Sequence, residues 1–127
     1  MDKFKQLKEN TNLLAEAADH LMKTFHKVKA TGEAEDFYEV VRPFANEVKQ
    51  LNDEWKEPAI IWVQENKPVY LNGAQIQSAS DHLEIISIQA FYPETSKKRF
   101  LDAAKSVQYI LQVLLNELNK WETSRLK

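Results

Sequence analysis

The sequence predicts an all-α protein, an up-down-up-down antiparallel four-helix bundle that forms one domain over residues 1–127. Apolar residues recur at intervals of three and four positions in four separate stretches, which is the spacing of helices that bury one stripe along their length. The chain contains only two glycines and four prolines, too few for a β architecture with many turns. The connections between the stretches are short, and short connections join antiparallel helices.

The first helix is expected from about Asp2 to Lys29. Thr11 occupies one position of its otherwise apolar stripe, and a single polar residue in a core often fixes the register of the helices. Lysines near the end of this stretch suit the negative end of the helix dipole, and Gly32 can adopt the left-handed conformation that ends a helix. The stripe consists of Phe4, Leu7, Thr11, Leu14, Ala18, Leu21, Phe25 and Val28.

The second helix is expected from about Glu35 to Asn66. Pro43 and Pro58 lie inside it, and each lacks the N–H group that would bond one turn back. Because the apolar stripe keeps its phase across both prolines, we predict one long helix that is kinked at the prolines; a true break near Pro58 is the alternative. The stripe consists of Phe37, Val41, Phe44, Val48, Leu51, Trp55 and Trp62.

The short segment Pro68–Asn72 separates the second and third helices, and its residues favour an extended conformation. Side chains alternate in an extended segment, so Val69 and Leu71 are expected on one side and Tyr70 on the other, with either side facing the core. The third helix is expected over about Ala74–Phe91, with a stripe that consists of Ile76, Ala79, Leu83, Ile86 and Ala90.

The fourth helix follows Pro93, and either Thr95 or Ser96 can cap its first turn. Its apolar stripe shows no phase error up to the region of the C-terminus. The stripe consists of Phe100, Ala104, Val107, Leu111, Leu114, Leu118 and Trp121.

Composition and charge exclude several classes of protein. The longest uninterrupted apolar run, Ala59–Val63, is far shorter than the roughly 20 residues that cross a membrane. The net charge of −2 gives no general attraction to nucleic acid. The chain has no cysteine, and its first residues are charged from Asp2 onwards, unlike a signal peptide. We expect a soluble cytoplasmic protein that binds neither membranes nor nucleic acid.

The stripes carry no residues that suit metal binding or standard catalysis. No glutamate is followed three positions later by a histidine, which is the pattern of di-metal helical bundles. His20 and His26 fall at outer positions of the first helix and His82 lies beside a stripe position, so at least two of the three should face solvent. Neither a cysteine nucleophile nor a glycine-rich phosphate loop is present. We predict no metal, no cofactor and no catalytic residue, a pattern that disfavours an enzyme of standard mechanism.

Lys97, Lys98 and Arg99 lie in the first turn of the expected fourth helix, where positive charge opposes the helix dipole. Departures from a local rule of this kind are enriched at functional sites. One interpretation is a contact site for an acidic protein partner. The alternative is internal pairing, either with the acidic second helix or with Glu94 and Asp102.

Four aromatic residues are expected near the prolines and the extended segment, namely Trp55, Trp62, Tyr70 and Trp121, and the first three are the candidates for a ligand groove. Aromatic residues at stripe spacing usually belong to a core, which is one interpretation. The other is an apolar groove at the kink that binds a small ligand, where a freed carbonyl and the indole N–H groups supply the polar contacts.

Several short motifs of this chain are similar to those of a known bacterial family. They are Phe37-Tyr38 through Arg42-Pro43, Lys67-Pro68-Val69-Tyr70, Gln75-Ile76, Lys97-Lys98-Arg99-Phe100 and Ser106-Val107-Gln108-Tyr109. In these motifs, over about residues 35–112, the chain resembles the YppE-like family of small uncharacterised proteins from Bacillus and its relatives. The resemblance implies a single four-helix domain in a cytosolic bacterial protein. It implies no activity and no functional residues, because the family has none assigned.

These features lead to three hypotheses about function. The leading one is a non-enzymatic protein–protein interaction module that uses Lys97–Arg99. The second is a small-ligand-binding bundle that uses the aromatic groove. The third is self-association as a homodimer, because regular apolar stripes can also close a dimer.

Overall fold

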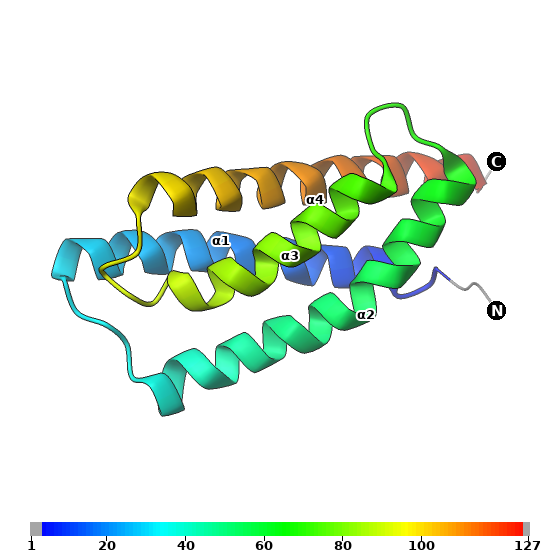
Figure 1. The fold of residues 1–127 in the computed structure, drawn as a ribbon. Coiled ribbons are helices and arrows are strands. Elements are labelled where there is room, and N and C mark those ends of the chain that lie inside the picture. The colour runs from blue at the N-terminus through cyan, green and yellow to red at the C-terminus, as the bar shows by residue number, and fades with distance from the viewer. Residues whose placement is uncertain (1–3, 126–127) are drawn as a thin grey trace.

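The computed structural model describes residues 4–125, and within this range the chain forms four α-helices, one short π-helical turn and no strand. The all-α, four-helix prediction is therefore confirmed. Figure 1 shows the four helices packed side by side. The beginning of α1 and the end of α4 lie at the same end of the molecule, and the end of α1 lies near the beginning of α4 at the other.

Helix α1 runs from Leu7 to Thr31, and every residue of the predicted first stripe is buried. The chain from Phe4 to Gln6 is a turn, so the helix begins later than expected; Asp2 lies outside the described residues. The predicted end is confirmed, because Gly32 adopts a left-handed conformation with φ of 71° and its N–H donates to the carbonyl of Val28. A residue with a Cβ is strained at that φ, which explains the choice of glycine.

A π-helical turn, η1, spans Phe37–Val41 and precedes α2. The wider winding is defined by hydrogen bonds that reach five residues back, and the N–H of Val41 donates such a bond to the carbonyl of Asp36 at 3.1 Å. One extra residue in a helical turn rotates the preceding side chains by about 100° around the helix axis. Phe37 is consequently 46% exposed, and its predicted place in the core stripe is wrong, whereas Val41 is buried as expected.

Helix α2 runs from Arg42 to Asn66 and contains both prolines. Pro43 lies in the first turn, where a missing N–H costs little. Pro58 lies inside the helix, which continues through it, so the alternative of a true break is excluded. Figure 1 shows α2 changing direction along its length. Lys67, the residue that follows the helix, is left-handed with φ of 48°, and its N–H donates to the carbonyl of Val63.

The segment between α2 and α3 is a turn and not an extended strip with alternating side chains. Val69 and Tyr70 are both exposed, whereas Leu71 is buried. Both predicted alternations are therefore wrong, because two successive side chains at the tip of the turn point into solvent and only the third returns to the core.

Helix α3 runs from Gly73 to Gln89 and buries every residue of its predicted stripe within these bounds. A capping box holds its first turn, since the Asn72 side chain accepts from the N–H of Gln75 at 2.9 Å and the Gln75 side chain accepts from the N–H of Asn72 at 2.8 Å. These reciprocal bonds satisfy two backbone donors, which explains the abrupt start of the helix.

Helix α4 runs from Lys97 to Arg125. The N–H of Arg99 donates to the hydroxyl of Ser96 at 3.4 Å, so Ser96 is the predicted cap. The stripe is buried from Phe100 to Leu118, and Trp121 is half-buried against the edge of the core.

Candidate functional site

The predicted basic corner, Lys97, Lys98 and Arg99, is fully on the surface at the beginning of α4. The Lys98 ammonium lies 3.2 Å from the Asp102 carboxylate, one turn along the same helix, and both side chains are well exposed. An exposed pair of this kind contributes only a few tenths of a kcal/mol. Within residues 4–125, neither Lys97 nor Arg99 forms an ion pair. Of the three cations, only Lys98 therefore forms an ion pair within residues 4–125, and its partner lies on α4 and not on the acidic second helix.

The basic corner is joined to the end of α1 by aromatic packing. The Phe25 and Phe100 rings stack at a centroid distance of 4.1 Å with an interplanar angle of 13°. Lys29 also reaches across, and its ammonium donates to the carbonyl of Pro93 at 2.7 Å. These contacts bring the lysines of the last turns of α1 to the same end of the molecule as Lys97–Arg99.

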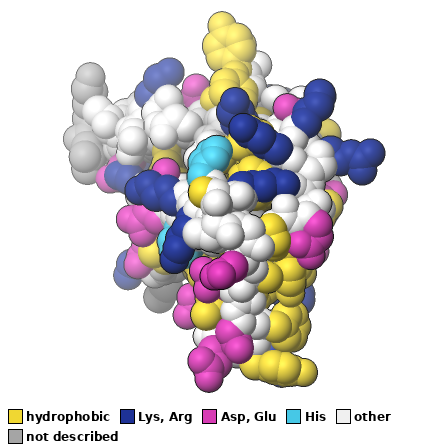
Figure 2. Space-filling view, turned by 90° about the vertical axis from the view of Figure 1, so that its left-hand side faces the viewer, with side chains coloured by type: hydrophobic (Ala, Val, Ile, Leu, Met, Phe, Trp, Pro, Cys, Tyr) yellow, Lys and Arg dark blue, Asp and Glu magenta, His cyan; other side chains and the backbone are white. Residues whose placement is uncertain are grey.

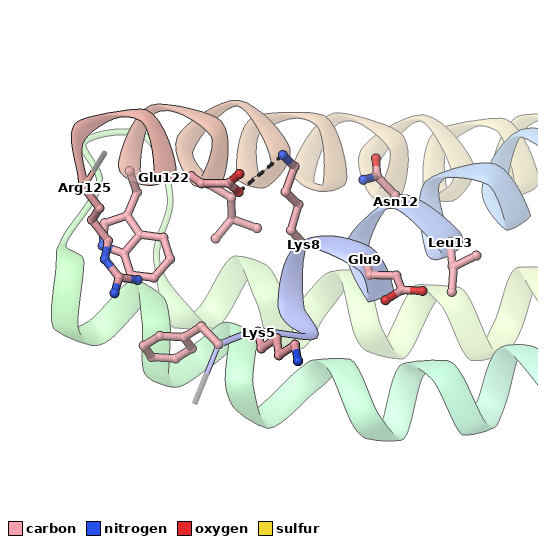
Figure 3. Close-up of a pocket in the computed structure, with 10 residues that line it drawn as sticks. Lys5, Lys8, Glu9, Asn12, Leu13, Glu122 and Arg125 are labelled. Atoms are coloured by element: carbon pink, nitrogen blue, oxygen red, sulfur yellow. Dashed lines mark hydrogen bonds and ion pairs between the residues drawn. The ribbon is translucent and has the colours of Figure 1, made fainter. Parts of the chain in front are cut away.

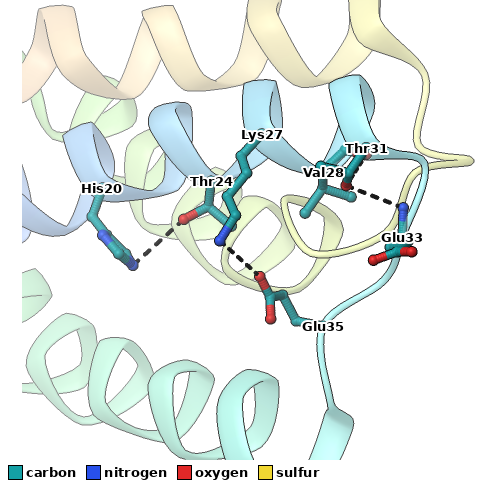
Figure 4. Close-up of polar contacts among 7 residues, drawn as sticks. All are labelled: His20, Thr24, Lys27, Val28, Thr31, Glu33 and Glu35. Carbon is teal, nitrogen blue, oxygen red and sulfur yellow. Dashed lines mark hydrogen bonds and ion pairs between the residues drawn. The ribbon is translucent and has the colours of Figure 1, made fainter.

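Acidic side chains occupy the other half of this end. In Figure 2 the lysine and arginine side chains gather over the upper half of the face, and most of the aspartate and glutamate side chains lie over the lower half. One link between the two halves is the ion pair of Lys27 and Glu35, with 3.8 Å between the ammonium and the carboxylate (Figure 4). Figure 4 also shows His20 beside the hydroxyl of Thr24, 3.5 Å away.

A shallow hollow of about 290 Å³ lies between α1 and η1 at this end. Two apolar side chains contribute to its lining, Val40, which is 38% exposed, and Phe91, which is buried. Its two lysines each form an ion pair, Lys23 with Asp19 and Lys27 with Glu35. The neighbouring η1 turn exposes Phe37 and Tyr38, whose rings meet edge to face at 5.2 Å. The hollow is lined by His20, Lys23, Thr24, Lys27, Glu35, Val40 and Phe91.

The three aromatic residues predicted to form a groove are not brought together on the surface. Trp55 and Trp62 are buried in the core, whereas Tyr70 is 74% exposed at the tip of the α2–α3 turn. An indole without exposed surface cannot contact a ligand in an open groove, so the core interpretation holds for both tryptophans. A small hollow of about 180 Å³ does lie beside Pro58, lined by Phe4, Glu57, Pro58 and Ile61.

A larger cavity, of about 490 Å³, lies at the opposite end of the molecule between the beginning of α1 and the end of α4 (Figure 3). Its aromatic wall is formed by Phe4 and Trp121, which meet edge to face at 5.9 Å. Trp121 meets Trp62 of the core in the same manner, also at 5.9 Å. The sequence contained one signal of this site. Phe4 is the first residue of the first apolar stripe and Trp121 is the last residue of the fourth, and these two stripe ends meet in the structure.

The described residues contain no cluster suited to a metal ion: within 4–125, no three His, Cys, Asp or Glu side chains converge. His20 and His26 are exposed, which confirms that at least two of the histidines face solvent. Hydrogen bonding and attraction to Asp53 raise the pKa of Lys49, but this is an exposed pair on one face of α2. No helix within the described range is long and apolar enough to cross a membrane.

Comparison with known proteins places the chain in a family. It is 29% identical over 119 residues to the uncharacterised protein YppE of Bacillus subtilis, covering 94% of this chain and 96% of that one. The crystal structure of B. subtilis YppE superposes with a TM-score of 0.87 at 26% identity, covering 94% of this chain and 97% of the other. A Listeria innocua protein of unknown function superposes with a TM-score of 0.86 at 28% identity, covering 93% and 94%.

The resemblance to the YppE-like family that the sequence motifs indicated is thus confirmed. Residues 11–118, which include the core of all four helices, match a family described as a bacterial domain of unknown function, DUF1798. This chain therefore belongs to the DUF1798 family.

Proposed function

We propose that this protein is a non-enzymatic protein–protein interaction module whose basic corner, Lys97–Arg99, contacts an acidic segment of a partner. The observation that carries the proposal is the exposure of three cations in one helix turn, two of them without an ion pair within residues 4–125. Positive charge at the beginning of a helix is unfavourable for the helix itself. A partner with negative charge offsets that cost.

The surroundings of the corner support a partner that is acidic and carries an apolar side chain. Exposed apolar side chains at this end, Val40 at 38% and the rings of Phe37 and Tyr38 on η1, can contact an apolar group of the partner. Stacking of Phe25 on Phe100 already fixes the backbone below the cations. The backbone there therefore loses little conformational freedom when a partner binds.

A second copy of the chain also fits this description. Acidic side chains lie on the same end as the basic corner, so two copies related by a two-fold axis can place each acidic half against a basic half. Sedimentation at several protein concentrations distinguishes this homodimer from a complex with another protein.

The proposal is tested by affinity capture from the native host with two matched variants. The corner variant carries Lys97→Gln, Lys98→Gln and Arg99→Gln. The control variant carries Lys49→Gln, Lys105→Gln and Lys120→Gln, which removes an equal number of positive charges from other exposed positions. We expect the wild type and the control to retain a partner that the corner variant loses. Equal retention by all three proteins would exclude the corner as the contact site.

We also infer that neighbouring helices alternate in direction and that Pro58 bends α2. Support for the first inference comes from α1 and α4, where Lys8 pairs with Glu122 and Phe25 stacks on Phe100, so the beginning of each helix meets the end of the other. Opposite directions are also indicated for α1 and α2 and for α2 and α3, because a later residue of one helix meets an earlier residue of the other in each pair. The contacts are Thr11 with Trp55, His20 with Phe44, Asn52 with Ser80 and Phe44 with Phe91. Proline removes one hydrogen bond from the interior of a helix, which is a common cause of bending.

The composition supports a cytoplasmic location for this activity. The chain has no cysteine and so forms no disulfide, which suits a reducing compartment. Fractionation of the native host followed by detection of the protein in each fraction tests this location.

A further inference from the structure

We infer that the cavity between the beginning of α1 and the end of α4 binds a small amphiphile with a hydrocarbon chain and one anionic head group. The cavity measures about 490 Å³, within the usual range of small-molecule sites. Its lining residues come from the beginning of α1 and the end of α4, which lie at the opposite end of the molecule from the beginning of α4 (Figure 1), so the inference does not rest on the proposed protein contact.

The apolar part of the cavity suits a hydrocarbon chain. The apolar side chains that line it are Phe4, Leu118, Trp121 and Leu13, the last of which is 39% exposed. These four side chains supply no polar group apart from the indole N–H, so they cannot recognise a strongly polar ligand. Leu13 and half-buried Trp121 keep apolar surface in contact with water, and an apolar chain that covers this surface is favourable.

Charged groups also line the cavity, and in Figure 3 Lys5, Lys8 and Glu122 lie between Leu13 and Arg125. The Lys8 ammonium lies 3.3 Å from the Glu122 carboxylate, an ion pair that spans from α1 to α4. The guanidinium of Arg125 lies over the Trp121 ring, 4.6 Å from its centroid. Lys5, Glu9 and Asn12 complete the polar lining.

The polar lining favours a negative head group over a positive one for two reasons. Three cations, Lys5, Lys8 and Arg125, face two carboxylates, Glu9 and Glu122, and the beginning of α1 adds the positive end of a helix dipole. In addition, the ring of Trp121 already carries the Arg125 guanidinium, so a cationic head group would have to displace it to reach the ring.

The test uses octanoate below its micellar concentration as the probe. Its 8-bromo derivative should quench the fluorescence of half-buried Trp121 in a saturable manner, and Trp121→Phe should remove most of that quenching. Octanol and octylammonium should compete several-fold less well than octanoate. Quenching without saturation would show that the cavity holds no site, and equal competition by octanol would show that the head group is not recognised.

Substitutions in the cavity lining separate this site from unspecific binding to apolar surface. Leu13→Asp should weaken octanoate binding about tenfold, because it removes apolar contact and adds a like charge. Ile85→Asp is the matched control, since Ile85 is a comparably exposed aliphatic residue, 48% exposed, on α3 and outside the cavity lining. Equal weakening by the two variants would overturn the assignment of the site.

Charge variants give an effect in both directions. Lys5→Gln should weaken octanoate binding about two- to fivefold, as expected for one exposed charge contact. Glu122→Gln should strengthen it by a similar factor, because it releases Lys8 from its ion pair and removes a negative charge from the polar lining. Tighter binding to Lys5→Gln or weaker binding to Glu122→Gln would contradict an anionic head group, and circular dichroism confirms that both variants fold.

Discussion

The indole N–H of Trp55 on α2 donates a hydrogen bond of 3.0 Å to the hydroxyl of Thr11 on α1, and both side chains are fully buried. The Thr11 hydroxyl in turn donates to the carbonyl of Leu7 at 2.6 Å. The single polar position in the first apolar stripe therefore has a specific partner on the neighbouring helix. This relationship fixes how α1 and α2 lie against each other, because a shift of either helix would leave a buried polar group unpaired.

Replacing Thr11 by valine should destabilise the protein by about 1–3 kcal/mol, because the buried N–H of Trp55 loses its acceptor while the shape of the residue is kept. Thr11→Ser keeps the acceptor and loses only a methyl group, so it should cost less. Urea denaturation measures both effects. A double-mutant cycle with Trp55→Phe isolates the pair, and a coupling energy near zero would show that the hydrogen bond does not link the helices.

The π-helical turn leads to a contrast between Phe37 and Val41. Phe37→Ser should lower the free energy of unfolding by less than about 1 kcal/mol, because the ring is already 46% exposed in the folded protein. Val41→Ala should cost about 1–3 kcal/mol, because it removes two buried methyl groups from the core. Thermal or urea unfolding tests the pair. A large loss for Phe37→Ser would place the ring in the core and restore a regular α-helix over this turn.

Neutralising the basic corner should leave the protein as stable as the wild type or make it more stable. Each of the three cations opposes the dipole of α4 by a few tenths of a kcal/mol. The ion pair of Lys98 with Asp102, which the substitution removes, is exposed and contributes a similar amount. Comparison of the corner variant with the control variant by urea denaturation tests this, and a loss above about 1 kcal/mol in the corner variant alone would show that the cations stabilise the fold.

Periodicity was sufficient to predict the regular part of the fold. The stripes of α1, α3 and α4 are buried as predicted, with only Trp121 partly exposed, because each of these helices keeps one winding and one face toward the core throughout its length. The single polar stripe residue, Thr11, also lies in the core as expected. Periodic burial therefore reports on architecture reliably where the backbone hydrogen bonds are regular.

The features that were missed depend on hydrogen bonds and side-chain packing that periodicity does not encode. The π turn includes the bond from the N–H of Val41 to the carbonyl of Asp36, five residues back, and this winding moves Phe37 out of the core without altering the sequence pattern. The exposed pair Val69 and Tyr70 belongs to a turn whose shape is set by the flanking caps. The cavity at Trp121 depends on the space that neighbouring side chains leave unfilled, which no single stripe predicts.

The salt dependence of partner binding tests the central claim most directly, namely that Lys97, Lys98 and Arg99 form the contact site. With a captured partner in hand, the dissociation constant of the wild type should rise strongly between about 50 and about 500 mM salt, because salt screens exposed charges. The corner variant should bind more weakly at low salt and show a smaller salt dependence, and the control variant should behave as the wild type does. Equal affinities and equal salt dependences for the wild type and the corner variant would contradict the claim.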